Sequence, residues 1–443
     1  MQPVVTVAEM RAADAAAPVP VDVLIERAGR AVANRAMHMM GGAYGRRVAI
    51  VAGKGNNGAD ARAAGQALVR RGAYVSVSDP GCPLPADADL VIDGAYGTGM
   101  RGSYEAPTTA APVLAIDIAS GVDGDTGAAC EGAVTAAATV TMAARKPGLL
   151  LGAGPAHCGA VEVADIGLPV RANAHLVEDA DLGWLPVRPR ATHKWASAVW
   201  IVAGSPGMRG APELCARAAQ RAGAGMLHVG SPGLAAAEHP AGEAVAVGLA
   251  DRAWEETVLG ELDRFRALVV GPGLGRSDAT AAAARRLVGA LRLPAVVDAD
   301  GLHALGQPGS LRPAGGAPLV LTPHEGEFAR LMGEPPGSDR IGAVRSLAAR
   351  TGAVVLLKGP TTVVADPAGR VLLAAAGDAR LATAGTGDVL SGVIGAFLAA
   401  GVPGLEAAAL GAHVHGRAGA RGFRIGLVAG DLPDLIPPVL EAR

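Results

Sequence analysis

Short apolar runs alternate with alanine-rich stretches along the first 165 residues, after an amphipathic opening over residues 7–40. The β-branched runs predict buried strands. They occupy residues 47–52, 74–78, 90–93, 113–118 and 134–142. Alanine-rich segments such as residues 59–71 predict intervening helices. Strands separated by helices need crossover connections, so this half is expected to form a parallel sheet.

A second alternating series follows a break in the pattern. Residues 165–190 carry clustered prolines and scattered charges without a clear period, which predicts a domain boundary. Seven further apolar runs predict strands at residues 198–203, 226–229, 267–270, 295–297, 319–321, 354–357 and 362–365. The chain is therefore expected to be an α/β protein with two tandem domains, residues 1–180 and 190–443.

Composition narrows the class of partner. Of the 443 residues, 39 are basic and 41 acidic, and they are interspersed, so neither nucleic acid nor a membrane surface is an expected partner. The start of the chain lacks the pattern of a secretory signal, and no apolar stretch is long enough to span a bilayer. Four scattered cysteines indicate neither a zinc site nor a disulfide framework. We expect a cytoplasmic protein that acts on a small molecule. The sequence allows a homo-oligomer but does not decide the oligomeric state.

The rarity of lysine and asparagine draws attention to the few positions where they occur. Arginine outnumbers lysine 35 to 4, and asparagine also occurs four times. Lys146 and Lys358 are two of the four lysines, and Asn56 and Asn57 form an adjacent pair. Each of these residues lies in sequence typical of a loop. We therefore expect each to have a function that arginine or another polar residue does not perform.

The first predicted strand runs into a glycine-rich loop, residues 53–60, and the helix is expected to begin near Ala59. A GxGxxG spacing lets backbone N–H groups and a helix N-terminus meet a phosphate. Asp79 ends the next strand, where a dinucleotide fold keeps a ribose-binding acid. The alternative is a turn that only tightens the junction between strand and helix.

Two further polar loops, residues 93–99 and 117–123, follow strands of the same predicted sheet. Such sheets bind ligands at the carboxyl ends of their strands. Asn57, Asp93 and Ser120 bring hard oxygen atoms to this edge and are candidate ligands of a monovalent cation. The alternative is that Asp93 and Asp117 cap following helices.

These three loops, and residues 146–149 after them, resemble in order the motifs of NAD(P)H-hydrate epimerases. The resemblance implies a Rossmann-like three-layer sandwich, Asp117 as catalytic acid or base, and K⁺ bound by Asn57, Asp93 and Ser120. It departs from the family pattern at Ala59, usually glycine, and at Ala119, usually proline. The substrate contacts it implies are Asn56, Asn57, Gly58, Ala59, Asp60, Gly97, Thr98, Gly99, Met100, Arg101, Gly102, Ser103 and Asp117.

The strongest motif of the second half is residues 384–388, followed by an apolar helix over residues 389–400. Small residues at a helix N-terminus expose backbone N–H groups, which form an anion hole for a transferring phosphoryl group. Asp388 lies at its mouth, where a carboxylate takes the proton of an attacking hydroxyl. The alternative is an ordinary N-cap aspartate.

Other loops of the second half are expected at the same edge of its sheet as residues 384–388. Residues 358–362 offer a cation and hydroxyls suited to nucleotide phosphates. His324 lies between a proline turn and two glutamates, which favours a site role over a structural one. Residues 204–207, 271–275 and 298–300 are further loops at expected strand ends.

Together these motifs resemble the ADP-dependent NAD(P)H-hydrate dehydratase domain, a relative of the ribokinase group. The resemblance implies a ribokinase-like α/β domain in which ADP, with Mg²⁺, phosphorylates the ring hydroxyl and phosphate then leaves. It implies that Asp388 is the base, and Gly301 and His303 depart from the pattern. The implied hydrate pocket contains Ala211, Gly273, His324 and Asp388, and the implied nucleotide contacts are Lys358, Gly359, Pro360, Thr361, Thr362, Gly385, Thr386 and Gly387.

Both halves then fit one repair enzyme, which exchanges the epimers of a hydrated nicotinamide dinucleotide and dehydrates one of them. The main alternative is a small-alcohol or vitamin kinase with a non-catalytic dinucleotide-binding module in front of it. A dehydrogenase would explain the first loop but leaves residues 384–388 without a role. An N-terminal half that only binds its ligand is the remaining alternative.

Overall fold

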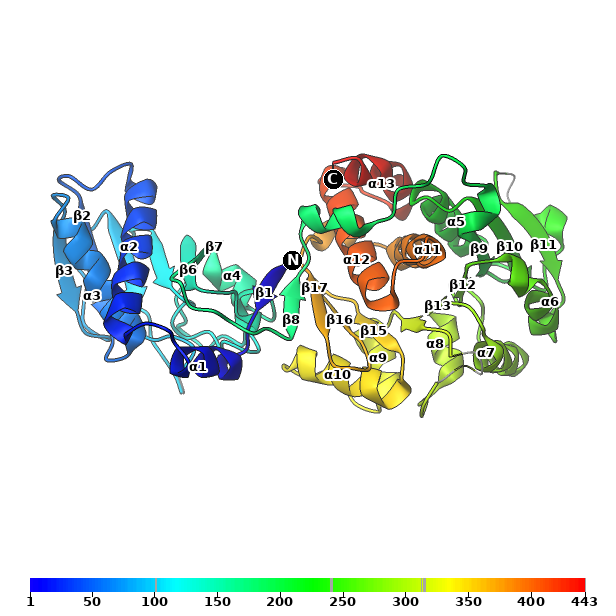
Figure 1. The fold of residues 1–443 in the computed structure, drawn as a ribbon, viewed down its shortest axis with the longest axis horizontal. Helices are drawn as coiled ribbons and strands as arrows, with labels where there is room; N and C mark the ends of the chain where they lie inside the picture. The colour runs from blue at the N-terminus through cyan, green and yellow to red at the C-terminus, as the bar shows by residue number, and fades with distance from the viewer. Residues whose placement is uncertain (100–101, 240–241, 312, 314–315, 443) are drawn as a thin grey trace. The chain divides into compact units, whose positions relative to one another are not determined.

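The computed structural model describes residues 1–99, 102–239, 242–311, 313 and 316–442. Two compact units divide the chain: an N-terminal unit of residues 2–174, and a C-terminal unit of residues 175–443 together with Met1. Both combine helices and strands (Figure 1). Within the described ranges, no helix is long and apolar enough to cross a membrane.

A parallel sheet forms the centre of the N-terminal unit. Its strand order is β3-β2-β4-β5-β6-β7, and every pairing is parallel. This confirms the parallel sheet predicted from the alternation of strands and helices. The strands are β2 (Arg47–Ala52), β3 (Tyr74–Ser78), β4 (Leu90–Gly94), β5 (Val113–Ile116), β6 (Ala138–Met142) and β7 (Ala160–Ala164).

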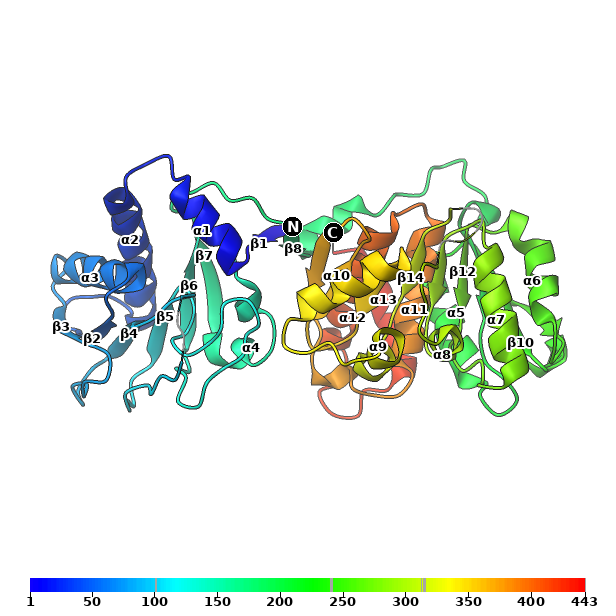
Figure 2. The same cartoon turned by 90° about the horizontal axis from the view of Figure 1, so that it is seen from below.

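Each face of this sheet has its own apolar core, because successive strand residues point to opposite faces. Val48 and Ile50 of β2 pack in the core beneath the helices, whereas Ala49 and Val51 pack in the core on the other face. The helices are α1 (Val7–Ala15), α2 (Val21–Met40), α3 (Asn56–Val69) and α4 (Gly154–Cys158). α2 and α3 lie side by side over the first core in both views (Figures 1 and 2).

The larger sheet of the C-terminal unit has the order β8-β17-β16-β15-β14-β13-β12-β9-β10-β11. From β15 to β11 the pairings are parallel. Its strands are β8 (Ala174–Leu176), β9 (Ala198–Val202), β10 (Met226–Pro232), β11 (Val245–Leu249), β12 (Ala267–Val270), β13 (Ala295–Val297), β14 (Leu319–Leu321), β15 (Val354–Leu357), β16 (Thr362–Ala365) and β17 (Val371–Ala374).

The strand over residues 362–365, β16, runs antiparallel to β15 and to β17, so the second sheet is mixed. Only four residues join β15 to β16, whereas a parallel crossover needs about a dozen. A tight connection therefore reverses the chain at residues 358–361, and these loop residues are held between two adjacent strands.

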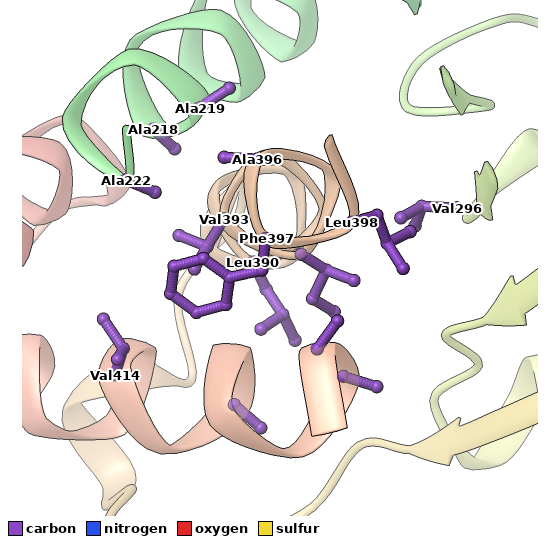
Figure 3. Close-up of a cluster of buried hydrophobic side chains, with 14 of the residues drawn as sticks. Ala218, Ala219, Ala222, Val296, Leu390, Val393, Ala396, Phe397, Leu398 and Val414 are labelled. Atoms are coloured by element: carbon purple, nitrogen blue, oxygen red, sulfur yellow. The ribbon is translucent and has the colours of Figure 1, made fainter. Parts of the chain in front are cut away.

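Helices cover the larger sheet on both faces, and α11 lies in the middle of the core (Figure 3). α11 is buried from Val389 to Ala399, as expected of a helix that is apolar on all sides. A Cβ added to Gly392 would lie 2.2 Å from the carbonyl oxygen of Cys215, so α11 and α5 meet backbone to backbone. The helices are α5 (Gly210–Arg221), α6 (Trp254–Glu261), α7 (Asp278–Ala290), α8 (Asp300–Leu305), α9 (Glu325–Met332), α10 (Arg340–Thr351), α11 (Thr386–Ala399), α12 (Gly404–Arg421) and α13 (Leu432–Leu440).

Several element boundaries differ from the sequence expectation. α3 begins at Asn56 rather than near Ala59, so most of the glycine loop is already helical. β5 ends at Ile116 because Asp117 has a positive φ of 68°, which a strand does not accommodate. β6 begins at Ala138, and the residues from 134 onward that were expected to start it form a loop. Strands β7, β8, β11 and β17 were not predicted.

Candidate functional sites

A cavity of about 570 Å³ opens beside the carboxyl ends of β2, β4 and β5 in the N-terminal unit. α1 and α2 supply apolar wall residues, including Met10, Leu24 and Ile25. Many of the predicted substrate contacts line it: Asn56, Asn57, Gly58, Asp60, Gly97, Thr98, Gly99 and Asp117. The structure therefore brings loops that are up to 61 positions apart in the chain to one cavity.

Other predicted contacts lie elsewhere. Ala59 is the fourth residue of α3, with ordinary helical backbone, and it lines a surface groove between α2 and α3 rather than the cavity. The methyl group that departs from the family pattern thus causes no strain. Gly102 and Ser103 are not among the cavity residues, and Met100 and Arg101 lie outside the described residues.

Asp117 holds one carboxylate oxygen against three donors. Its Oδ1 accepts hydrogen bonds from the Thr141 hydroxyl at 3.1 Å, from the Met142 N–H at 3.3 Å, and from the Lys146 ammonium. In the described part of the chain, no residue donates to Oδ2. Asp117 is therefore fixed through one oxygen and keeps the other for a ligand.

Lys146 is the fixed positive charge of this site. Its side chain is 0% exposed, and its ammonium donates to Thr141 Oγ1 and to the Met142 carbonyl, both at 3.0 Å, besides Asp117. All three ammonium protons are thus used, as a buried lysine requires. Sequence analysis gave Lys146 no role of its own. The scarcity of lysine was the signal that pointed to it.

Asp60 is a second carboxylate of the cavity. It lies on α3, and only 7% of the residue is exposed. Burial, together with the negative charges of Asp117 and Asp14, raises the pKa of Asp60 to about 7. Asp60 and Asp117, two of the three carboxylates that line this cavity, therefore have contrasting surroundings.

The predicted cation ligands Asn57, Asp93 and Ser120 meet around the backbone of Tyr96. Ser120 Oγ donates to Asp93 Oδ1 at 2.7 Å and accepts from the Tyr96 N–H at 2.9 Å. Asn57 Nδ2 donates to the Tyr96 carbonyl at 3.2 Å, which leaves the Asn57 amide oxygen unused by the described residues. Burial raises the pKa of Asp93, opposed by its hydrogen bonds from Ser120. The alternative role of helix cap is wrong for Asp93 and Asp117, because a loop follows each of them.

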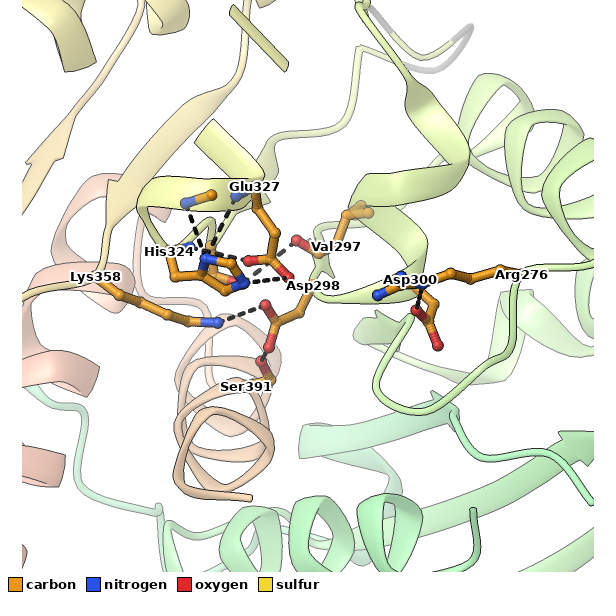
Figure 4. Close-up of polar contacts among 10 residues, drawn as sticks. Arg276, Val297, Asp298, Asp300, His324, Glu327, Lys358 and Ser391 are labelled. Carbon is orange, nitrogen blue, oxygen red and sulfur yellow. Dashed lines mark hydrogen bonds and ion pairs between the residues drawn. The ribbon is translucent and has the colours of Figure 1, made fainter. Parts of the chain in front are cut away.

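The centre of the C-terminal site is an ion pair between a buried aspartate and a half-buried lysine (Figure 4). Asp298, which follows β13 and is 1% exposed, accepts from Lys358 Nζ at 2.6 Å and from Ser391 Oγ at 2.7 Å. Sequence analysis assigned Lys358 to nucleotide binding and assigned no role to Asp298 or Ser391. The structure shows that the charge of Lys358 has a protein partner.

Asp388 lies on the first turn of α11, close to this pair. The N-cap of α11 is Gly385, with a φ of 90°, so the reading of Asp388 as an N-cap residue is wrong. Burial, followed by the negative charge of Asp298, raises the pKa of Asp388 to about 6, whereas the charge of Lys358 opposes the rise. A carboxylate with a pKa near neutrality is suited to proton transfer.

The loop between β15 and β16 approaches the same helix terminus. A Cβ added to Gly387 would lie 3.3 Å from Lys358 Nζ, so α11 begins directly beside that ammonium. Arg340 of α10 forms an ion pair with Glu325 and donates to the Lys358 carbonyl at 3.4 Å. Arg340 is a positive charge at the predicted nucleotide loop that sequence analysis missed.

The residues predicted for the hydrate pocket fall into two groups. Gly273 and Ala211 are neighbours, because a Cβ on Gly273 would lie 3.0 Å from that of Ala211. His324 is the N-cap of α9, where its Nδ1 accepts from the Gly326 N–H at 3.0 Å. At Gly301 an added Cβ would lie 3.0 Å from the Val270 carbonyl oxygen, a tight contact that a small shift of the neighbouring backbone would relieve.

The comparisons with known proteins match both units. The family model described as NAD(P)H-hydrate dehydratase matches residues 199–437, and that of the YjeF-related protein N-terminus matches residues 21–84 and 78–148. A bifunctional NAD(P)H-hydrate repair enzyme, Nnr, of Salinibacter ruber is 36% identical, covering 100% of this chain and 96% of the relative.

Solved structures match the C-terminal unit. An ADP/ATP-dependent NAD(P)H-hydrate dehydratase from Bacillus subtilis, co-crystallised with ATP and Mg²⁺, is 30% identical with a TM-score of 0.53, covering 60% of this chain and 96% of that one. A ribokinase-like superfamily protein from Enterococcus faecalis, 24% identical with a TM-score of 0.52, covers 61% of this chain and 96% of its own and shares the fold. The expected ribokinase-like fold is confirmed. This chain belongs to the family of bifunctional NAD(P)H-hydrate repair enzymes.

Proposed function

We propose that the N-terminal unit exchanges the two epimers of hydrated NADH or NADPH, and that the C-terminal unit dehydrates one epimer with ADP. The observation that carries the proposal is the presence of two separate sites in one chain: Asp117 follows β5 in the first, and Asp388 lies on the first turn of α11 beside the Asp298–Lys358 pair in the second. We assign the first activity to residues 1–180 and the second to residues 190–443, in a cytoplasmic protein.

In the dehydratase site, Asp388 takes the proton of the ring hydroxyl as that oxygen attacks the terminal phosphoryl group of ADP, and AMP leaves as the phosphoanhydride bond breaks. Backbone N–H groups of Gly385, Thr386 and Gly387 contact the phosphoryl oxygens at the start of α11. Inorganic phosphate then leaves, and loss of a proton from the neighbouring ring carbon restores the reduced nicotinamide.

The nucleotide is assigned to Lys358, Gly359, Pro360, Thr361 and Thr362, with Arg340 as an added positive charge. Among the described residues, no group of three or more histidine, cysteine or acidic side chains is placed to hold a metal ion. This suits Mg²⁺ that is held chiefly by nucleotide phosphates and water, as is usual for this ion. Ala211, Gly273 and His324 are assigned to the hydrate.

In the epimerase site, Asp117 acts as acid or base through the oxygen that its protein partners leave unused. K⁺ would be held by Asn57, Asp93 and Ser120, joined by the Tyr96 carbonyl. The donor set fits in kind, since all four groups carry oxygen atoms: Asn57 and Ser120 both contact the Tyr96 backbone, and Asp93 is joined to Ser120 at 2.7 Å. A bound K⁺ would supply positive charge near the substrate.

One incubation tests both assignments. Purified protein is mixed with both hydrate epimers, ADP and Mg²⁺, and the absorbance of reduced nicotinamide is followed together with inorganic phosphate. Complete conversion is expected. A plateau near the fraction of dehydratable epimer would mean that the N-terminal unit only binds, and a stable phosphate ester without recovered absorbance would indicate the small-alcohol kinase, which family membership disfavours.

A further inference from the structure

We propose that Asp60 is a second catalytic residue of the N-terminal site, the acid that protonates the departing hydroxyl of the hydrate, with Asp117 as the matching base. This rests on the epimerase activity proposed above. The substrate-contact role that sequence analysis gave Asp60 did not distinguish it from its neighbours in the loop.

Burial and the lack of a partner single out Asp60. The residue is 7% exposed and lines the cavity, yet none of the described residues donates a hydrogen bond to its carboxyl group. Asp117 lines the same cavity with three donors on one oxygen. A buried carboxylate without donors is unfavourable in its charged form, whereas the neutral acid tolerates the same position.

The charges around Asp60 act in the same direction. The charged residues that line the cavity are Arg11 and Asp14 from α1, Asp117, Lys146 and Asp60 itself. Lys146 is already paired with Asp117, and Asp14 and Asp117 both raise the pKa of Asp60, after burial, to about 7. On its own helix, Arg62 donates instead to the Gly53 and Ala52 carbonyls, at 2.9 and 3.1 Å.

Epimer exchange needs an acid and a base of this kind. The added hydroxyl sits on a ring carbon bonded to the ring nitrogen. When the C–O bond breaks, the nitrogen lone pair forms a C=N⁺ bond, and the oxygen takes the proton of Asp60 and leaves as water. Water then adds to the other face of that carbon, the C=N⁺ bond returns its electron pair to nitrogen, and Asp117 takes the proton.

The exchange consumes nothing. Proton transfer through water from Asp117 back to Asp60 restores the starting site, so atoms and charge balance over the cycle. Two carboxyl groups with different surroundings are the arrangement that divides acid and base roles between like residues. In this cavity the division follows from Lys146, which serves Asp117 and leaves Asp60 without a partner.

The test compares wild type with Asp60→Asn and Asp60→Glu, using one purified epimer and subtracting the rate of exchange in buffer. Asparagine resembles the neutral acid in size and charge, so Asp60→Asn is expected to fold, and a thermal unfolding scan checks this. Its exchange rate at pH 6.5 should fall by about 10² to 10⁴, the usual cost of losing an acid or base. Asp60→Glu should recover part of the rate.

The pH profile separates catalysis from structure. The wild-type rate should fall as pH rises through about 7, where Asp60 loses its proton, and the residual rate of Asp60→Asn should lack that fall. Dehydration of the competent epimer, measured in the same chain, should stay at the wild-type rate. Exchange by Asp60→Asn within threefold of wild type, or with the same falling limb, would overturn the role of Asp60. A wild-type chain with no exchange would instead overturn the epimerase assignment.

Discussion

Lys358 Nζ lies 2.6 Å from Asp298 Oδ1, so the lysine expected to hold a nucleotide phosphate also neutralises a buried carboxylate. Asp298 is 1% exposed, and Ser391 binds its other oxygen. The pair therefore joins the loop after β15 to the loop after β13 and to α11, which carries Asp388.

Lys358→Met is expected to raise the Michaelis constant for ADP and to lower stability as well. It leaves Asp298 buried without a counter-charge, which typically costs about 3 kcal/mol in the free energy of unfolding. Urea unfolding and ADP titrations of the rate measure the two effects. The double variant Lys358→Met with Asp298→Asn should recover most of the stability but not the affinity. An unchanged Michaelis constant in Lys358→Met would place the nucleotide elsewhere.

Asp388→Asn should abolish dehydration while ADP binding stays nearly intact. The amide keeps the shape of the side chain but does not accept a proton, and loss of a general base costs about 10² to 10⁴ in rate. Single-turnover kinetics and calorimetry of ADP binding measure the two quantities. Turnover close to wild type would remove Asp388 from the mechanism.

The pH dependence of dehydration follows from the raised pKa of Asp388. The base works in its charged form, so the rate should fall as pH drops through about 6, the value to which burial and the Asp298 charge raise its pKa. The rate is measured between pH 5 and 8 under saturating ADP, with Asp388→Asn as the control. A wild-type profile flat down to pH 5 would contradict this role.

Lys146→Met should stop epimer exchange and destabilise the N-terminal unit. Lys146 is 0% exposed, and its loss leaves Asp117 without its charged partner, at a cost of about 3 kcal/mol in the free energy of unfolding. Exchange of a purified epimer and thermal unfolding measure the effects. Adding Asp117→Asn should restore stability but not exchange, and Asp117→Ala alone should stop exchange without affecting dehydration. Normal exchange in Lys146→Met would show that the ion pair is not needed.

Potassium should assist epimer exchange alone. Replacing K⁺ with tetramethylammonium, whose methyl groups keep oxygen ligands away from its charge, should slow exchange and leave the dehydration rate unchanged. Ser120→Ala removes one candidate ligand and should weaken the dependence on K⁺ concentration. Equal exchange rates in the two salts would contradict the cation site.

The sequence predicted strands well where apolar runs were short and sharply bounded. β2 and β12 to β16 have the expected bounds, because glycine, proline or charged residues interrupt the runs on either side. The antiparallel orientation of β16 was not predicted, since periodicity carries no information on strand direction. β11 was missed although its sequence, VAVGL, is apolar; four of its five residues are half-buried or exposed, as in a strand at the edge of a sheet.

The candidate sites were predictable only as sets of loops. Motifs identified the residues that follow each strand, but not their partners: Asp298 lies 60 positions from Lys358 and 93 from Ser391. Asp117 and Lys146 are likewise 29 positions apart. Such pairs form when the sheet aligns its strand ends, so only the folded chain shows that Lys146 pairs with Asp117 and not with Asp60.

The close contact at Gly392 connects the packing of the core to the position of the catalytic Asp388. α11 is held against α5 without room for a methyl group, and the same rigid helix carries Asp388 one turn from Gly392. A side chain at this position would displace the helix and with it the proton acceptor, by a fraction of an ångström that matters for proton transfer. Substitutions at Gly392 should therefore lower turnover as well as stability, although the residue is buried in the core.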